Sequence, residues 1–122
     1  MVKVLVVDNS EVIRNLLTEY LTELGYVVES AVNGLDGIEK ALNGDYDVVI
    51  CDIHMPKRNG YQVFSEVSGQ KPHLPFIMTD SLPDTLAERA VNEGAYACLS
   101  KPFNLDQVKK TMDQILAKAK TK

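Results

Sequence analysis

The chain alternates five times between a short apolar run and a stretch with helical spacing of its apolar residues. The first run is continuous and β-branched, which is typical of a strand covered on both faces. The five runs lie at Val2 to Val7, Tyr26 to Val28, Asp47 to Cys51, Pro75 to Met78 and Ala95 to Leu99. Because parallel strands are joined by right-handed crossovers that usually contain a helix, the alternation predicts an α/β fold. We expect a (βα)5 doubly wound domain, with helices on both faces of a five-stranded parallel sheet.

The stretches between the apolar runs carry start and stop signals of helices. Turn glycines mark the predicted ends of the first, second and fourth helices: Gly25, Gly44 and Gly94. A short third helix is expected over Tyr61 to Val67. The fourth is expected to begin with Ser81 as N-cap, Pro83 in its first turn and Asp84 reaching back. The last helix is expected to be capped from Asn104.

Length and composition limit the classes of protein that need to be considered. At 122 residues the chain is predicted to be a single domain over 1–122, with 45% hydrophobic and 25% charged residues, as in ordinary globular proteins. A net charge of −4 argues against nucleic acid as a direct partner, because phosphate contacts need a basic surface. No long apolar run or charged-then-apolar leader is present, so we expect no membrane span, no secretory signal and a cytoplasmic location.

Polar residues stand where three of the predicted strands end. The third run stops at Asp52, the first is followed by Asp8 and Asn9, and the fourth is followed by Thr79. The carboxyl ends of parallel strands meet at one edge of the sheet, where ligands of open α/β folds bind. The sequence therefore predicts a site at this edge that contains an acid, an amide and a hydroxyl beside Asp52.

With these residues in order, the whole chain resembles the receiver domain of two-component response regulators. The resemblance is carried by Val4 to Asp8, Asp52 to Pro56, Asn59-Gly60, Thr79, Gly94-Ala95 and Lys101 to Phe103. It implies the strand order 2-1-3-4-5, which is the order known for flavodoxin and the chemotaxis regulator. It also implies a cis peptide bond between Lys101 and Pro102, since bonds before proline tolerate cis.

The resemblance implies a phosphoacceptor chemistry that the residues can support. A carboxylate can attack a phosphoryl group, so Asp52 is the expected acceptor, with the fixed cation Lys101 offsetting charge on the phosphoryl oxygens. Thr79 would donate its hydroxyl to a phosphoryl oxygen after phosphorylation. Mg²⁺ prefers carboxylates, water and phosphate oxygens, and would bind Asp8, Asp52 and the backbone carbonyl of His54.

The implied activity is that of a switch in a phosphorelay. The phosphoryl group would come from a histidine kinase or a phosphotransfer protein. A downstream protein would bind the face formed by the fourth helix, the fifth strand and the fifth helix. Such a protein is a signalling regulator and not an enzyme, beyond promoting its own phosphorylation and dephosphorylation.

Three positions depart from the family pattern. Asn9 replaces a second acid that is a direct metal ligand in the family, so Mg²⁺ binding is expected to be weak. Asp80 replaces a small residue. One expectation is that it slows phosphorylation, by repelling the phosphodonor or by pairing with Lys101. The other is that it points to solvent at a helix start. Cys98 replaces an aromatic residue, and Tyr96 is expected on the same strand face as Cys98.

These departures leave a second hypothesis open, a degenerate receiver that binds its partner without phosphorylation.

His54 is expected either to overhang the acyl phosphate or to be an exposed loop residue. Together with Asp80 and Ser81 it is expected to govern the access of water to the acyl phosphate. Cys51 and Cys98 are interpreted as reduced thiols that act as small hydrophobes. A flavodoxin-like cofactor binder or small phosphohydrolase would need a flavin loop, or an acid at the position of His54, and is disfavoured.

Overall fold

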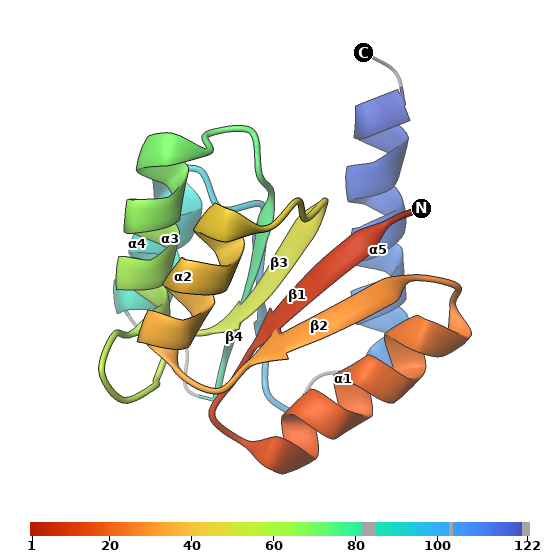
Figure 1. Ribbon diagram of the computed structural model, residues 1–122, viewed down its shortest axis with the longest axis horizontal. Helices are drawn as coiled ribbons and strands as arrows, with labels where there is room; N and C mark the ends of the chain where they lie inside the picture. Colours follow the sequence, from red (N-terminus) through yellow and green to blue (C-terminus); the bar gives the residue numbers. More distant parts are fainter. Residues whose placement is uncertain (82–84, 103, 121–122) are drawn as a thin grey trace.

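A computed structural model describes residues 1–81, 85–102 and 104–120. Figure 1 shows a central twisted sheet with helices packed on both sides. In chain order the elements are β1 (Lys3–Val7), α1 (Glu11–Glu23), β2 (Val27–Ala31), α2 (Gly34–Asn43), β3 (Val48–Asp52), α3 (Gly60–Gln70), β4 (Phe76–Asp80), α4 (Thr85–Asn92), β5 (Ala97–Ser100) and α5 (Leu105–Lys120). Over the described ranges the sheet has five parallel strands in the order β2-β1-β3-β4-β5, which confirms the predicted fold class and strand order.

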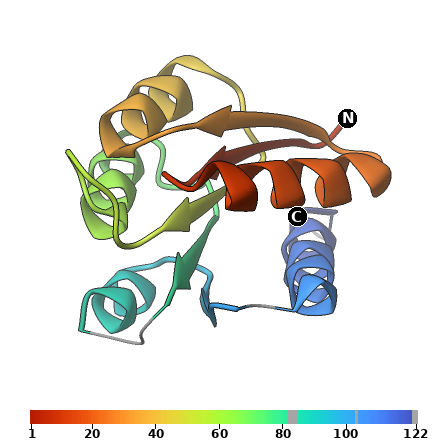
Figure 2. The same ribbon diagram turned by 90° about the horizontal axis from the view of Figure 1, so that it is seen from below.

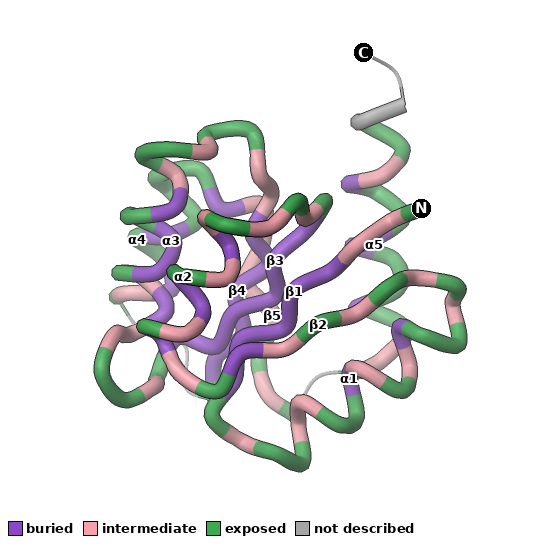
Figure 3. Tube along the Cα trace, viewed as in Figure 1, coloured by how far each residue is buried: buried purple, intermediate pink, exposed green. Residues whose placement is uncertain are grey.

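Two apolar clusters lie on opposite faces of the sheet. One contains buried residues of α1 and α5, and the other contains buried residues of α2, α3 and α4 (Figure 2). Along β1 the side chains alternate between them, so that Val4 and Val6 belong to the first cluster and Leu5 and Val7 to the second. All residues of β3 and β4 are buried, as Figure 3 shows for the middle of the sheet. Burial on both faces explains why the strands read as continuous apolar runs.

Local sequence signals fix several helix ends. Ser10 and Asn33 cap α1 and α2 by accepting hydrogen bonds from the backbone N–H three residues ahead. Asn59 caps α3 in a capping box with Gln62, in which each side chain accepts from the other residue's backbone N–H. Gly25 lies just after α1 with a φ of 95°, in the left-handed region that a glycine adopts at little cost.

The strand and helix ends differ from the predicted ones by a few residues. β2 continues to Ala31 and β4 to Asp80, whereas β5 begins only at Ala97. β4 extends because its last carbonyl groups are paired: Ile53 N–H donates to Thr79 O (2.9 Å) and Lys101 N–H to Asp80 O (2.6 Å). α3 runs from Gly60 to Gln70, longer than predicted at both ends.

The predicted start of the fourth helix lies partly outside the described residues. α4 is described from Thr85, and the predicted contacts of Pro83 and Asp84 lie outside the described residues. Within the part of the chain that the structure covers, no helix combines the length and apolar character needed to cross a membrane.

Candidate phosphoacceptor site

Four polar side chains converge at the carboxyl edge of the sheet. Asp8 follows β1, Asp52 ends β3, Thr79 lies near the end of β4, and Lys101 follows β5. Each stands two residues after a strand residue of the α1–α5 cluster, so strand alternation directs all four to that face. Asp52 is also paired with Thr79 in the register of β3 and β4. The structure thus brings together the acid, the hydroxyl and the cation that the sequence singled out.

Lys101 bridges the two carboxylates. Its Nζ lies 2.9 Å from Asp8 Oδ2 and 3.3 Å from Asp52 Oδ1, with the lysine side chain only 15% exposed. The Lys101–Pro102 peptide bond is cis, as the resemblance implies. Because both acids contact one ammonium nitrogen, at least one oxygen of each faces the same small volume.

Burial and charge act in opposite directions on the ionisation of this group. Burial raises the pKa of the Asp52 carboxyl; the Lys101 charge lowers it and the Asp8 charge raises it, and the net shift is upward. Burial lowers the pKa of Lys101, but the hydrogen bond to Asp8 and the charge of Asp52 outweigh it, so the pKa is raised. Lys101 therefore remains a cation at neutral pH and offsets part of the charge of the two acids.

The start of α1 fixes Asp8 from the other side. Ser10 N–H donates to Asp8 Oδ1 at 2.8 Å, while Arg14 Nη1 donates to the Asp8 carbonyl at 2.7 Å. Asn9, between Asp8 and Ser10 in the chain, is exposed at the rim of the site. The neutral amide of Asn9 can offer an oxygen to a cation but adds no negative charge.

The donor set fits a magnesium ion rather than a transition metal. No group of three His, Cys, Asp or Glu side chains suited to a metal occurs in the described part of the chain. Mg²⁺ needs only one or two carboxylates when water and phosphate oxygens complete its octahedron. Asp8 and Asp52, which Lys101 holds next to each other, supply that number of carboxylates, with Asn9 as an uncharged neighbour.

Gly60 positions the end of β3, a role that the sequence reading did not assign to it. A Cβ at this position would lie 2.2 Å from the Asp52 carbonyl oxygen and 2.8 Å from Ile53 Cα, both backbone atoms. Gly60 N–H also donates to Ile53 O at 2.7 Å. The Asn59-Gly60 pair, which carried part of the resemblance, was the available signal: a cap residue followed by a glycine where the helix start meets the strand end.

The Asp80 side chain neither points to solvent nor pairs with Lys101, whereas the expectation that it repels the phosphodonor stays a prediction. Asp80 follows Met78 by two residues and so points to the α2–α4 face, away from Thr79 and Lys101. It is wholly buried rather than solvent-exposed, and its Oδ1 lies 3.3 Å from His54 Nε2. The predictions that it points to solvent or pairs with Lys101 are wrong, because strand β4 includes Asp80 and imposes the alternation on it.

His54 and Ser81 lie on the outer side of this contact. The His54 side chain is 53% exposed even though its ring reaches Asp80. Ser81 is exposed directly after β4. The structure thus supports the expectation of an exposed loop histidine, while the influence of His54, Asp80 and Ser81 on water access stays a prediction.

Tyr96 and Cys98 lie on opposite faces of the sheet, so the expectation that they share a face is wrong. Cys98 packs with the α2–α4 cluster, whereas Tyr96 packs with the α1–α5 cluster and its OH lies 3.4 Å from Gln114 Oε1. The reason is that β5 begins at Ala97, so strand alternation does not extend back to Tyr96. Neither Cys51 nor Cys98 forms a disulfide bond, and burial raises the pKa of the Cys51 thiol.

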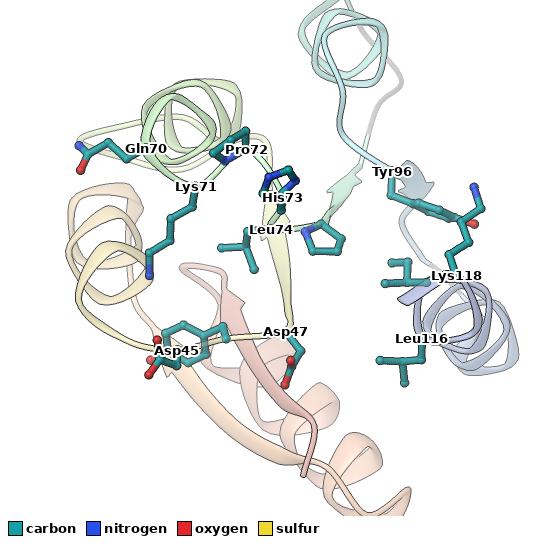
Figure 4. A pocket seen from close by; sticks show the side chains of 13 residues that line it. Asp45, Asp47, Gln70, Lys71, Pro72, His73, Leu74, Tyr96, Leu116 and Lys118 are labelled. Atoms are coloured by element: carbon teal, nitrogen blue, oxygen red, sulfur yellow. The ribbon is translucent and has the colours of Figure 1, made fainter. Parts of the chain in front are cut away.

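A hollow of about 890 Å³ lies at the opposite, amino-terminal edge of the sheet. Figure 4 shows Leu74, Tyr96 and Leu116 around it, with Asp45 and Asp47 on its far side. None of the four residues of the candidate site lines it. The hollow is therefore separate from the cluster of Asp8, Asp52, Thr79 and Lys101 at the strand ends.

The fold and the strand-end site are those of a receiver domain, and comparison with known proteins supports this class. Residues 4–113 match the family model of the response regulator receiver domain, so the chain belongs to that family. The chain is 35% identical to the chemotaxis protein CheY of Halobacterium salinarum over 93% of this chain and 96% of that protein. It is 34% identical to the sensor histidine kinase RcsC of Escherichia coli over 89% of this chain. Because the matched part is only 12% of RcsC, the chain spans a small fraction of that relative.

A solved structure with similar sequence is the response regulator TrrA of Thermotoga maritima in complex with Mg²⁺ and BeF. The two chains are 34% identical, with a TM-score of 0.84, over 94% of this chain and 99% of TrrA. Receiver domains are signalling switches and not classical enzymes.

Proposed function

We propose that this chain is a phosphoacceptor switch in which Asp52 receives a phosphoryl group from a histidine kinase or phosphotransfer protein. The observation that carries the proposal is the shared contact of Asp8 and Asp52 with Lys101, with Thr79 beside Asp52 in the sheet. The proposal includes a cytoplasmic location and a protein rather than a nucleic acid as the downstream partner. Output through the face of α4, β5 and α5 is also part of it.

Each residue has a role that its geometry allows. A carboxylate oxygen of Asp52 attacks phosphorus, the bond from phosphorus to the donor breaks, and the donor leaves with that electron pair. Lys101, 15% exposed and already at the carboxylates, offsets charge on the phosphoryl oxygens with little reorganisation. The Thr79 hydroxyl donates a hydrogen bond to a phosphoryl oxygen, which is present on Asp52 only after transfer. Such a contact exists in one state only, so it can shift a two-state equilibrium.

Magnesium would be held by Asp8 and Asp52, with the backbone carbonyl of His54 and the Asn9 amide as further oxygen donors. When bound, it supplies positive charge that offsets the phosphoryl oxygens and brings the donor phosphate next to Asp52. The binding of Mg²⁺ with BeF by TrrA supports this assignment. Asn9 in place of an acid supports weak binding.

The test is the intact mass after incubation with acetyl phosphate and Mg²⁺. We expect the mass of one phosphoryl group to be added, to depend on Mg²⁺, and to be lost in Asp52→Asn. Asp106→Asn, which removes an exposed acid from the first turn of α5, is the matched control and should still be phosphorylated.

A second function, a receiver that binds its partner without phosphorylation, is favoured by one observation, the neutral Asn9 beside Asp8. That function predicts no added mass for the natural chain even at high Mg²⁺. Gain of mass only after Asn9→Asp would refute the phosphoacceptor proposal for the natural chain and would favour the binding function.

A further inference from the structure

Helix α4 buries smaller apolar side chains than the neighbouring α3, although Leu86 also packs partly buried against the same core. Its buried residues are Ala87 and Ala90, whereas the neighbouring α3 buries Val63, Phe64 and Val67. Alanine side chains bury little apolar area, so the hydrophobic effect constrains the position of α4 less than that of α3. Elements with few buried apolar contacts are the ones that move at low free-energy cost.

A cluster of three side chains joins the carboxyl end of α4 to the first turn of α3. Tyr61 OH donates to Glu93 Oε1 at 2.7 Å, and Arg89 Nε donates to Glu93 Oε2 at 2.9 Å. The Arg89 guanidinium also stacks 4.8 Å from the centre of the Tyr61 ring. Each of the three residues therefore contacts the other two. The cluster supplies the directional contacts between α3 and α4 that the two alanines do not.

The tyrosine end of this cluster is anchored. The ring of Tyr61 is partly buried against the α2–α4 core, and α3 itself is fixed at its start by the capping box and by Gly60 against Asp52. Arg89 lies in α4 and Glu93 directly follows it. α3 and α4 are neighbours (Figure 1), and the hydrogen bond and the stacking connect the anchored helix to the one with the smaller buried side chains.

Helix α4 follows the strand that carries Thr79. β4 ends at Asp80 and α4 is described from Thr85, so the two elements are close together along the chain. A movement of Thr79 toward a phosphoryl group on Asp52 therefore acts on α4 through a short connection. Contacts that hold α4 in its present place oppose that movement.

We propose that the Tyr61–Arg89–Glu93 cluster is a latch that holds α4 against α3 in the unphosphorylated protein. The latch stabilises the present arrangement relative to the one in which Thr79 has moved toward Asp52, and so lowers the population of the moved arrangement before phosphorylation. The effect on phosphorylation rests on the function proposed above. The effect on α4 does not, because it concerns the unmodified protein.

The chain offers an unusually close control. Tyr46 OH donates to Glu29 Oε1 at 3.0 Å, Lys3 Nζ contacts Glu29 Oε2 at 2.9 Å, and Lys3 lies 5.0 Å from the Tyr46 ring centre. This is the same arrangement of tyrosine, glutamate and cation, but it joins β1, β2 and the connection before β3. Tyr46→Phe removes an equivalent hydrogen bond without touching α4.

The experiment compares the natural protein with Tyr61→Phe and Tyr46→Phe by hydrogen–deuterium exchange of α4, without phosphodonor. Losing one exposed, charge-assisted contact is expected to increase exchange of α4 amides in Tyr61→Phe by about two- to threefold. Tyr46→Phe should leave α4 unchanged. Equal exchange of α4 in Tyr61→Phe and the natural protein would overturn the latch.

The second measurement is the affinity for beryllofluoride with Mg²⁺, the ions bound by TrrA. Because the latch acts only on the unliganded state, Tyr61→Phe is expected to bind about two- to threefold more tightly, and Tyr46→Phe unchanged. General destabilisation of the fold would weaken binding or leave it unchanged, and either result would overturn the coupling to the site. If the natural protein itself bound no beryllofluoride, the proposed function and the coupling would fail together, while the α4 exchange would still decide the latch.

Discussion

Replacing Lys101 by methionine tests whether charge holds the candidate site together. Methionine keeps the apolar stem of lysine, so the substitution mainly removes the ammonium that contacts Asp8 at 2.9 Å and Asp52 at 3.3 Å. At an effective dielectric constant of about 20, each contact corresponds to about 5 to 6 kcal/mol of gross attraction. Desolvation cancels much of this, and breaking a buried pair by removing one partner costs about 3 to 5 kcal/mol. Since Lys101 is slightly exposed, we expect a loss of about 3 kcal/mol in the free energy of unfolding near neutral pH.

The assay is urea unfolding at two pH values. With a slope of about 1.5 kcal/mol/M, the midpoint should fall by about 2 M near pH 7. The pKa of Asp52 is already raised, and without Lys101 it rises further, so the folded state holds the Asp52 proton more tightly than the unfolded chain does. The variant therefore loses stability as pH rises above the unfolded pKa and regains it on acidification to about pH 4.

The matched control is Lys109→Met, because Lys109 Nζ also lies 2.9 Å from a carboxylate, that of Asp113, but both side chains are about half exposed. It should leave the midpoint almost unchanged at both pH values. A loss in Lys101→Met that is equal at both pH values would refute the electrostatic reasoning, since a packing defect does not depend on protonation of Asp52.

Three further outcomes are expected. Gly60→Ala should destabilise the fold by about 2 to 3 kcal/mol in urea unfolding, because the added Cβ would meet backbone atoms of Asp52. Gly69, in the same helix, has open space around it, so Gly69→Ala should stabilise the fold by about 0.5 to 1 kcal/mol. Equal effects of the two substitutions would contradict the close approach at Gly60. Burial and the hydrogen bond to Glu29 raise the pKa of Tyr46 to about 12, so the free energy of unfolding should fall between pH 10.0 and about 12. Alkaline denaturation curves of Tyr46→Phe should lack this loss. Asn9→Asp should strengthen Mg²⁺ binding measured by calorimetry, because it adds a carboxylate beside Asp8; unchanged affinity would show that Asn9 is not near the ion.

The fold was predictable because every level of the sequence favours the same architecture. The continuous apolar runs, the cap residues and the turn glycines agree with one another, and the site followed from the rule that strand ends share an edge. Side-chain direction was less predictable where a strand end was placed wrongly. The apolar run stops at Met78, so the sequence pattern places Asp80 beyond the strand, although the backbone pairs as far as Asp80 and turns its side chain to the far face. Tyr96 shows the reverse case, a residue assigned to a strand that begins one residue later.

Close backbone contacts were not predictable from periodicity, because they join segments that are distant in the sequence. The first residue of α2, Gly34, is an example: a Cβ there would lie 2.1 Å from the Arg58 carbonyl oxygen. Nothing in the local sequence of residue 34 refers to residue 58.

This contact has a consequence for how variants of the protein would be interpreted in a genetic screen. A larger side chain at position 34 would clash with Arg58 and displace the segment between Asp52 and α3. The same segment carries His54. A Gly34 variant could therefore fold with an intact set of site residues and still lose signalling, because the loop beside the acceptor has been displaced. Mutational maps of this chain should accordingly count Gly34 with the residues that govern the acceptor, although it lies on a different helix and carries no functional group.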